Sequence, residues 1–336
     1  MYKRIRFILI LLAVLLSGLY FKSLIPGNVS SQDTSSMNRS TESVNMNTAP
    51  VNQATQPIST STALLKQQPT GEKNLNSQYK ITLKDLETLK KDLQNYLKNF
   101  TGKYGVYYYN LVNGEEFGIN QEEEYTAAST IKVPLNLYLY QKIKSASVNP
   151  ENKLTYMKVD YEDGTGNIQY EDLGNKYSIR ELSKFSIVSS DNVAANMLFR
   201  FLGMANIKKY MRSVGGVVVD DNENISSPED MGLYMKLVYK FYKDGGALGN
   251  ELMNNLLNTE FNDRLPALLP KYVKVAHKIG TQVNVINDVG IVFSDEPYIL
   301  SVMSDNVDED EAPGIIANIS KKVYDFVNRK SIVYTK

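Results

Sequence analysis

The chain has 336 residues, and its 37 lysine and arginine residues balance its 37 aspartate and glutamate residues. This balance provides no global electrostatic attraction for nucleic acid or an acidic polymer. Cysteine is absent, which excludes disulfides, thiol nucleophiles and a lipidated N-terminal cysteine. The one histidine, His277, makes a histidine metal site or a Ser-His-Asp triad a poor explanation, so we expect neither metal nor cofactor.

The first residues predict passage across a membrane. Three basic residues within the first six precede a continuous apolar stretch over residues 7–16. This pattern leaves the N-terminus inside the cell while the chain that follows crosses. Because no small-x-small cleavage site follows closely, we interpret residues 1–27 as a cytoplasmic tip and an uncleaved signal anchor. The alternative is a cleaved signal peptide and a secreted protein.

Residues 28–78 have the composition of a linker. They are rich in Ser, Thr, Asn and Gln and hold few large hydrophobic residues. Such a segment cannot bury enough apolar surface to offset the entropy of ordering, so we expect it to be disordered. A tether of this length predicts that residues 79–336 work outside the cytoplasm, within reach of a cell wall.

The remaining chain, residues 79–336, carries the patterns of a folded domain. Leucines at helical spacing predict a first helix that begins near residue 82, and two strands are expected over residues 106–111 and 117–119 around the hairpin signal Asn113-Gly114. Start signals predict four more helices, at Ser129, after Ser178, at Asn192 and after Ser227. Three late strands and a closing helix are expected over residues 273–281, 289–294, 298–304 and 313–328.

Strands at both ends of this domain with helices between them define a fold class. The pattern predicts an α/β protein of the α+β type, in which one antiparallel sheet is built from both termini and flanked by the terminal helices. An all-helical lobe is inserted between the strands. We expect the functional site at the junction of sheet and lobe.

Ser129 and Lys132 form the first candidate catalytic pair. Ser129 precedes the apolar, helix-like run at residues 133–143, and the free N–H groups at a helix start stabilise a developing oxyanion. Lys132, one turn later, lies on the same helix face. If burial and neighbouring positive charge lower its pKa, Lys132 can accept the Ser129 proton.

Two later motifs supply what acyl transfer still needs. Ser190 can relay a proton to a leaving amine, and Asn192 offers an amide to a peptide-like substrate. Lys278 brings positive charge for a substrate carboxylate and for lowering the pKa of its neighbours. These functions require three distant segments to converge in space.

Together these motifs resemble the class A family of the serine β-lactamase and penicillin-binding-protein superfamily. The resemblance covers roughly residues 80–333 and is carried by residues 127–134, 190–196, 227–231 and 277–281. It implies a β-lactamase/transpeptidase-like fold. It also implies that Ser129 is the nucleophile and Lys132 its base or proton partner.

The resemblance implies functions for the other motif residues as well. Ser190 would be the proton shuttle, Asn192 a substrate-binding residue and Lys278 an electrostatic anchor. The third motif continues through Gly280 to Thr281, and both are expected to border the substrate. The backbone N–H groups of the nucleophile and of Thr281 would form the oxyanion hole.

Two departures from the family pattern bear on hydrolysis. Class A enzymes activate the deacylating water with an omega-loop glutamate, but residues 215–227 hold no Glu-x-x-Leu-Asn pattern and are short. Asp220, Asp221 and Glu223 are the acids available there, although a solvated turn is the preferred interpretation. Ile279 also replaces the usual hydroxyl residue after Lys278, so Thr281 would have to provide that hydrogen bond.

A further departure concerns the carboxylate-binding arginine of many class A enzymes. Residues 287–290 read Asn-Asp-Val-Gly at that place, and we expect Asp288 to repel an anionic substrate. His277, beside Lys278, either tunes the site or is a strand histidine bonded to its neighbours; we favour the second. Residues 161–167 resemble a loop that borders the site in related enzymes, and a plain surface turn is an equal alternative.

We therefore predict a membrane-anchored, extracytoplasmic serine hydrolase that forms an acyl-enzyme with β-lactams or related amides. The first alternative is a cell-wall D-Ala-D-Ala carboxypeptidase or peptidase, whose acyl donor is a peptidoglycan stem peptide. The second is a non-catalytic sensor of β-lactams or muropeptides. The partners expected are this substrate and the membrane.

Overall fold

The computed structural model describes residues 83–329, so the signal anchor and linker expected over residues 1–27 and 28–78 lie outside the described residues. A five-stranded sheet in the order β2-β1-β9-β8-β7 is the centre of this part of the chain. All of its neighbouring pairs are antiparallel. Its strands are β1 (Lys103–Asn110), β2 (Glu116–Ile119), β7 (Lys274–Gln282), β8 (Val285–Phe293) and β9 (Tyr298–Asp305).

The sheet joins the two ends of the domain. Strand β1 pairs with β9 along its whole length, with Lys103 opposite Asp305 and Asn110 opposite Tyr298. The Asn113-Gly114 turn connects β1 to β2, and Gly114 has a φ of 77°, a conformation that glycine adopts without strain. The predicted sheet built from both termini is confirmed.

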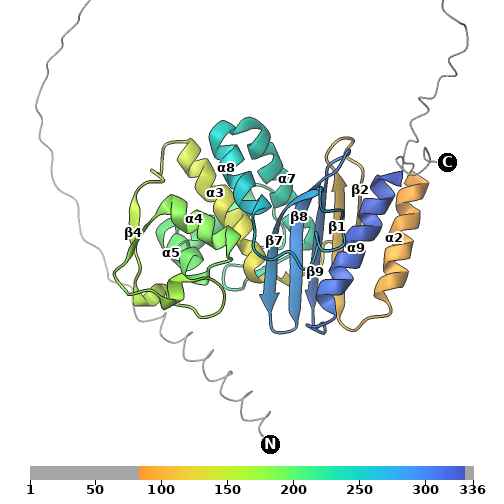
Figure 1. Cartoon of the computed structure of the whole chain (residues 1–336), viewed down its shortest axis with the longest axis horizontal. Helices are drawn as coiled ribbons and strands as arrows, with labels where there is room; N and C mark the ends of the chain where they lie inside the picture. Colours follow the sequence, from red (N-terminus) through yellow and green to blue (C-terminus); the bar gives the residue numbers. More distant parts are fainter. Residues whose placement is uncertain (1–82, 330–336) are drawn as a thin grey trace, which may run out of the picture. The chain divides into compact units, whose positions relative to one another are not determined.

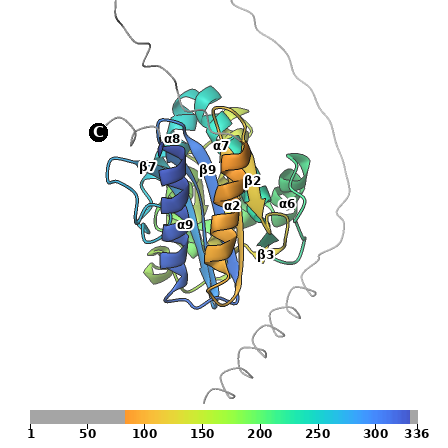
Figure 2. The same cartoon turned by 90° about the vertical axis from the view of Figure 1, so that its right-hand side faces the viewer.

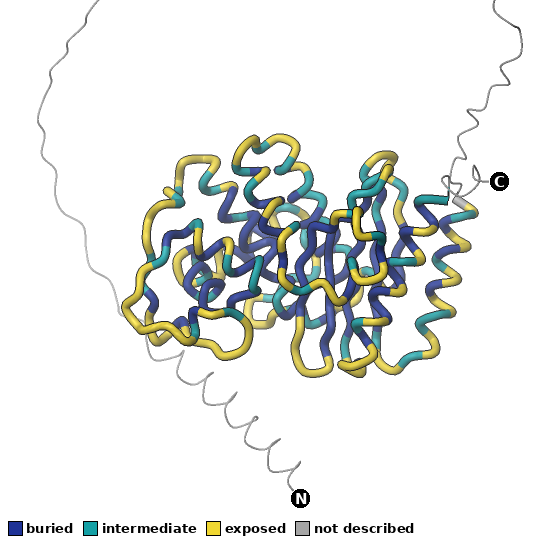
Figure 3. Tube along the Cα trace, in the orientation of Figure 1, coloured by how far each residue is buried: buried dark blue, intermediate teal, exposed yellow. Residues whose placement is uncertain are grey.

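Helices cover both faces of the sheet (Figure 1). The terminal helices α2 (Leu83–Leu97) and α9 (Ala312–Val327) lie side by side on one face, as Figure 2 also shows. Helices α7 (Pro228–Asp244) and α8 (Gly246–Leu257) contact the strands on the other face. Strands β8 and β9 are therefore buried nearly throughout (Figure 3).

The inserted lobe lies between β3 and β7 in sequence. Its longer helices are α3 (Lys132–Lys144), α4 (Ile179–Val188), α5 (Asn192–Leu202) and α6 (Met204–Ser213). Short elements connect them: β3 (Tyr125–Thr126), β4 (Lys153–Thr155), β5 (Lys176–Ser178), β6 (Ile225–Ser226) and the 3-10 turns η2 (Ala128–Ile131), η3 (Lys158–Asp160) and η4 (Ile168–Tyr170). The lobe shares one hydrophobic core with the inner sheet face, while a second core fills the space beneath α2 and α9.

Local signals explain where several of these helices begin. Ser178 accepts a hydrogen bond from the Glu181 backbone N–H, and the Glu181 carboxylate bonds back, which completes the predicted capping box of α4. Ser227 caps α7, and Pro228 occupies its first turn. Helices α6 and α8 were not anticipated, because neither has a side-chain cap at its start. No helix within residues 83–329 is long and apolar enough to span a bilayer.

Candidate active site

Ser129 lies at the junction of sheet and lobe. It is placed in the 3-10 turn η2, and the α-helix proper starts at Lys132 rather than at Ser129 as expected. Ala128, directly before the serine, has a φ of 47°, which is rare for a residue with a side chain. Residues three apart in a 3-10 turn are eclipsed, so Ser129 and Lys132 still face the same side.

Lys132 is nearly completely buried and points at the Ser190 region. Its Nζ donates to the Ser190 carbonyl at 2.6 Å, to the Asn192 Oδ1 at 2.8 Å and to the Ser190 Oγ at 3.3 Å. Burial lowers the pKa of Lys132 to about 8, against the opposing effect of the Glu162 and Asp191 charges. A substantial fraction of this amine is therefore neutral near physiological pH.

Lys278 reaches the same hydroxyl from the sheet. Its Nζ donates to the Ser190 Oγ at 2.8 Å and to the Ile279 carbonyl at 3.0 Å. Burial, followed by the charge of Lys132, holds the pKa of Lys278 well below its usual range. Because a hydroxyl has two lone pairs and one proton, the Ser190 Oγ can accept from both lysines and still donate its proton to a substrate atom.

The Ser190 loop is tied to residues 161–167. The Thr165 hydroxyl donates to the Ser190 carbonyl at 2.7 Å, and the Asn192 Nδ2 donates to the Asp163 carbonyl at 3.0 Å. The Asp191 carboxylate caps α5 and also accepts from the backbone of η4. Residues 161–167 are thus packed against the Ser190 motif. This agrees with the interpretation of these residues as a loop that borders the site rather than as a plain surface turn.

Strand β7 contacts residues 128–131, here called the nucleophile turn after the expected nucleophile Ser129, through Gly280. A Cβ at this position would lie 2.8 Å from the Ala127 carbonyl and 3.2 Å from the Ala128 Cβ, so only glycine fits without movement. The next residue, Thr281, lines the pocket beside Ser129, whereas Ile279 is buried and does not line it. All three motifs therefore meet around the Ser190 hydroxyl and the nucleophile turn.

Arg264 completes this edge of the site and was missed in the sequence. It lies in the loop before β7, and its Nη2 donates to the Thr281 Oγ1 at 2.6 Å. Its Nη1 donates to the carbonyls of Gly280 and Asn287 at 3.0 and 2.6 Å. No local motif marks this arginine, because its partners are strand residues distant in the chain.

The expected repulsion of an anionic substrate by Asp288 stays a prediction, and the carboxylate itself does not line the pocket. Asp288 is completely buried and accepts a hydrogen bond from the Leu265 backbone N–H at 3.0 Å. Its carboxylate also lies 2.9 Å from the His277 Nδ1. The carboxylate of Asp288 is therefore bonded to neighbouring groups within the fold, and His277 is a strand histidine bonded to its neighbours, as favoured above.

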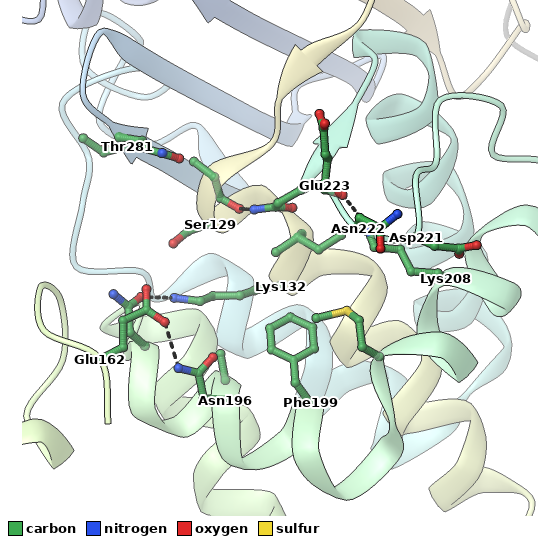
Figure 4. Close-up of a pocket in the computed structure, with 17 residues that line it drawn as sticks. Ser129, Lys132, Glu162, Asn196, Phe199, Lys208, Asp221, Asn222, Glu223 and Thr281 are labelled. Carbon is green, nitrogen blue, oxygen red and sulfur yellow. Dashed lines mark hydrogen bonds between the residues drawn. The ribbon is translucent and has the colours of Figure 1, made fainter. Parts of the chain in front are cut away.

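Ser129, Lys132 and Asn192 border a cavity of about 490 Å³ (Figure 4). It extends over the start of α5 and reaches the segment between α6 and α7. Its further lining residues include Glu162, Asn196, Phe199, Met204, Lys208, Asp221, Glu223 and Thr281. Within residues 83–329, no cluster of three or more histidine, cysteine, aspartate or glutamate residues is arranged to hold a metal ion.

Within the segment 215–227, residues 221–224 line one side of this cavity. Asp220 accepts from the backbone N–H groups of Asn222 and Glu223, so it stabilises its own turn. Asp221 pairs with Arg212 at 2.8 Å. The segment borders the site, but two of its three acids have structural partners.

The site combines Ser129 with the buried Lys132 in one cavity. Lys132 and Lys278 both donate to the Ser190 hydroxyl. This set of groups is typical of an active-site-serine hydrolase. A family model described as "Beta-lactamase enzyme family" matches residues 88–327, so the chain belongs to this family. The expected class of enzyme is therefore confirmed, and the chain is a serine hydrolase of the β-lactamase type.

Individual relatives are distant. The β-lactamase VEB-1 of Pseudomonas aeruginosa is 24% identical over 229 residues, which cover 60% of this chain and 76% of the relative. A β-lactamase of Bacteroides uniformis is 25% identical over 63% of this chain and 82% of its own length. The solved structure of PBP-A has a TM-score of 0.69 at 24% identity and covers 73% of this chain and 97% of that one. The predicted β-lactamase-like fold is confirmed.

Proposed function

We propose that this protein forms a covalent acyl-enzyme through Ser129 with β-lactams or related cyclic or linear amides. The observation that supports this most directly is the convergence of Lys132 and Lys278 on the Ser190 hydroxyl. Neutral Lys132 accepts the Ser129 proton as Oγ attacks the carbonyl carbon. Ser190 then donates its proton to the leaving nitrogen and is reprotonated from the lysines beside it.

The other contacts of the site bind the substrate. The backbone N–H groups of Ser129 and Thr281 would stabilise the oxyanion, and loss of one such donor costs about 100-fold to 1000-fold in rate. Thr281, held by Arg264, offers its hydroxyl at the place where a substrate carboxylate would bind. Asn192 presents its amide to the acyl donor.

Intact-protein mass spectrometry tests this function. Purified full-length protein is incubated with a penicillin and followed over time beside Ser129→Ala and a matched surface variant, Ser147→Ala. We expect an adduct of the mass of the penicillin on the wild type and on Ser147→Ala, and none on Ser129→Ala. Absence of both an adduct and penicillin consumption in the wild type would refute the proposal.

A cell-wall D,D-peptidase is the second candidate. Residues 215–227 hold no glutamate pattern of the class A type, and the open cavity beside α5 and α6 leaves room for a branched acyl donor. PBP-A has a similar fold, and a variant of it has been solved as an acyl-enzyme complex with penicillin G, so that protein is acylated by a β-lactam. Release of D-alanine from a D-Ala-D-Ala stem peptide would support this candidate over a β-lactamase.

A sensor without turnover is the third candidate. It predicts that Ser129→Ala retains ligand affinity and biological effect, and loss of both would exclude it.

The cellular location is likewise a proposal. The basic tip and apolar stretch of residues 1–27 support a single-pass anchor with the enzyme domain outside the cytoplasm. Protease treatment of intact cells tests this: the enzyme domain should be digested while a cytoplasmic marker survives. Recovery of the domain in the culture medium would instead indicate cleavage.

A further inference from the structure

Three carboxylates line the cavity that contains Ser129, namely Glu162, Asp221 and Glu223. Asp221 is paired with Arg212, and Figure 4 places it beside Lys208, at the far side of the cavity. Figure 4 also shows the Glu223 side chain directed away from Lys132. Glu162 is the acid on the same side as Lys132.

The carboxylate of Glu162 is held in position by α5. The Asn196 Nδ2 donates to the Glu162 Oε2 at 2.7 Å (Figure 4). Asn196 lies one helical turn after Asn192, whose Oδ1 accepts from Lys132, so both amides project from one face of the helix. A single helix face thus presents one amide to the lysine and the next to the carboxylate.

The backbone around Glu162 is fixed on both sides. The Asp163 carbonyl accepts from Asn192 at 3.0 Å. On the other side, the buried Asp160 carboxylate accepts from Arg200 at 2.6 and 2.9 Å. A carboxylate between two such anchors loses little further freedom when it binds a water molecule.

Glu162 also acts on Lys132 through space. Its negative charge is the largest influence that raises the pKa of Lys132 against the effect of burial. Glu162 and Lys132 therefore interact electrostatically, and both line the cavity that contains Ser129.

We propose that Glu162 is the general base that activates water for hydrolysis of the acyl-enzyme at Ser129. The inference rests on the proposed function, because it requires that the acyl-enzyme forms. The water oxygen bonds to the ester carbonyl carbon as Glu162 takes one water proton. The bond from this carbon to Ser129 Oγ then breaks and Oγ keeps the electron pair. The water proton held by Glu162 passes to neutral Lys132, which delivers a proton to Oγ, so that Glu162 is again a carboxylate and Lys132 is again neutral.

This assignment accounts for a family departure noted in the sequence. The base would come from residues 161–167, which precede the Ser190 motif, rather than from the short segment between α6 and α7. Both segments reach the same cavity from opposite walls. Hydrolysis therefore does not need a glutamate in residues 215–227.

Separate rates for acylation and deacylation test the proposal. The full-length wild type, Glu162→Gln and the matched control Asp163→Asn are mixed with a penicillin, and the adduct is followed by rapid-quench mass spectrometry. General-base catalysis typically contributes about 100-fold to 10,000-fold. We expect Glu162→Gln to acylate at a rate within a few-fold of the wild type but to deacylate at least 100-fold more slowly. Asp163→Asn should match the wild type in both steps.

The other outcomes are distinguishable. If the wild type forms no adduct and consumes no penicillin, the proposed function itself fails. If the wild type acylates and Glu162→Gln deacylates at the wild-type rate, or if the wild-type adduct persists as long as that of Glu162→Gln, acylation stands and Glu162 is not the base. A deacylation defect confined to Asp221→Asn or Glu223→Gln would assign the base to residues 215–227 instead.

Discussion

At the residue scale, Lys132 and Lys278 show how burial prepares acid–base chemistry. Both amines donate to one hydroxyl in the described structure, and both have lowered pKa values because their ammonium forms are desolvated. An exposed lysine would stay protonated at neutral pH and could not act as a base. The identity of Lys132 is a sequence property, whereas its basicity is a property of its surroundings.

The acylation rate should therefore depend on pH. Because the neutral form of Lys132 is the proposed base and its pKa lies at about 8, the rate should rise with pH and level off above this value. Rapid-quench acylation by a penicillin between pH 6 and 9 measures the profile. The control variant Lys208→Gln changes another lysine of the same cavity and should show the same pH profile as the wild type. A rate that does not change with pH would exclude Lys132 as the base and would leave it with an electrostatic function only.

Thr281 and Arg264 provide a second residue-scale prediction. Thr281→Val removes the hydroxyl that the Arg264 Nη2 holds at 2.6 Å. Because hydrogen bonds that involve charged groups contribute about 1.5–3 kcal/mol, the acylation efficiency with a penicillin should fall about tenfold or more. The methyl ester of the same penicillin is the control, since it lacks the carboxylate. An equal loss with acid and ester would contradict carboxylate recognition.

At the element scale, the site depends on close contact between β7 and the nucleophile turn. Gly280→Ala places a Cβ 2.8 Å from the Ala127 carbonyl, so β7 or η2 must move. We expect a loss of about 1–3 kcal/mol in unfolding free energy together with reduced acylation. Chemical denaturation and adduct formation measure the two effects. Gly314→Ala is the control, because a Cβ there meets no atom within 4 Å. Wild-type acylation by Gly280→Ala would show that this contact is not needed.

The capping box of α4 predicts an effect on stability alone. Ser178→Ala removes the acceptor for the Glu181 backbone N–H and should lower the unfolding free energy by about 1 kcal/mol. The cap bonds also lower the pKa of Glu181, so this stabilisation is present above the usual glutamate pKa and is lost as the pH falls. Urea denaturation at pH 7 and pH 3 measures the difference between variant and wild type. A difference that is larger at pH 3 would contradict this explanation.

At the scale of the whole molecule, the sheet separates two hydrophobic cores. Leu93 on α2 is fully buried in the core on the face away from the helical lobe, whereas the lobe shares the other core with the opposite face of the sheet. The proposed catalytic groups lie at the edge where β7 meets the lobe. The core beneath α2 and α9 therefore supports the site only through the sheet.

Leu93→Ala should consequently lower stability without changing the chemistry. Truncation of a buried leucine costs about 2–5 kcal/mol, which urea denaturation measures. Acylation at 25 °C should match the wild type once it is corrected for the folded fraction, and the exposed neighbour variant Gln94→Ala should alter neither property. A selective loss of acylation in a fully folded Leu93→Ala protein would show that the two cores are coupled more directly.

Most of the fold could be anticipated from the sequence. Hairpin and capping signals such as Asn113-Gly114 and Ser178 depend on neighbours in the chain, so local residues are sufficient to define them. Helices α6 and α8 have no such start signals and form because their apolar faces pack into the lobe. The helix after Ser129 also begins later than expected, at Lys132, because residues 128–131 form a 3-10 turn that contacts β7.

The sequence by itself determined the family, the sheet built from both termini and the identity of the motif residues, because those properties depend on residue type and order. Only the tertiary structure decided that Arg264 holds Thr281, that Asp288 pairs with His277, and that Glu162 lies in the cavity of the nucleophile. Each of these arrangements brings together residues from different elements of the fold. Their geometry, and the burial that lowers the lysine pKa values, arise only when the sheet and lobe pack together.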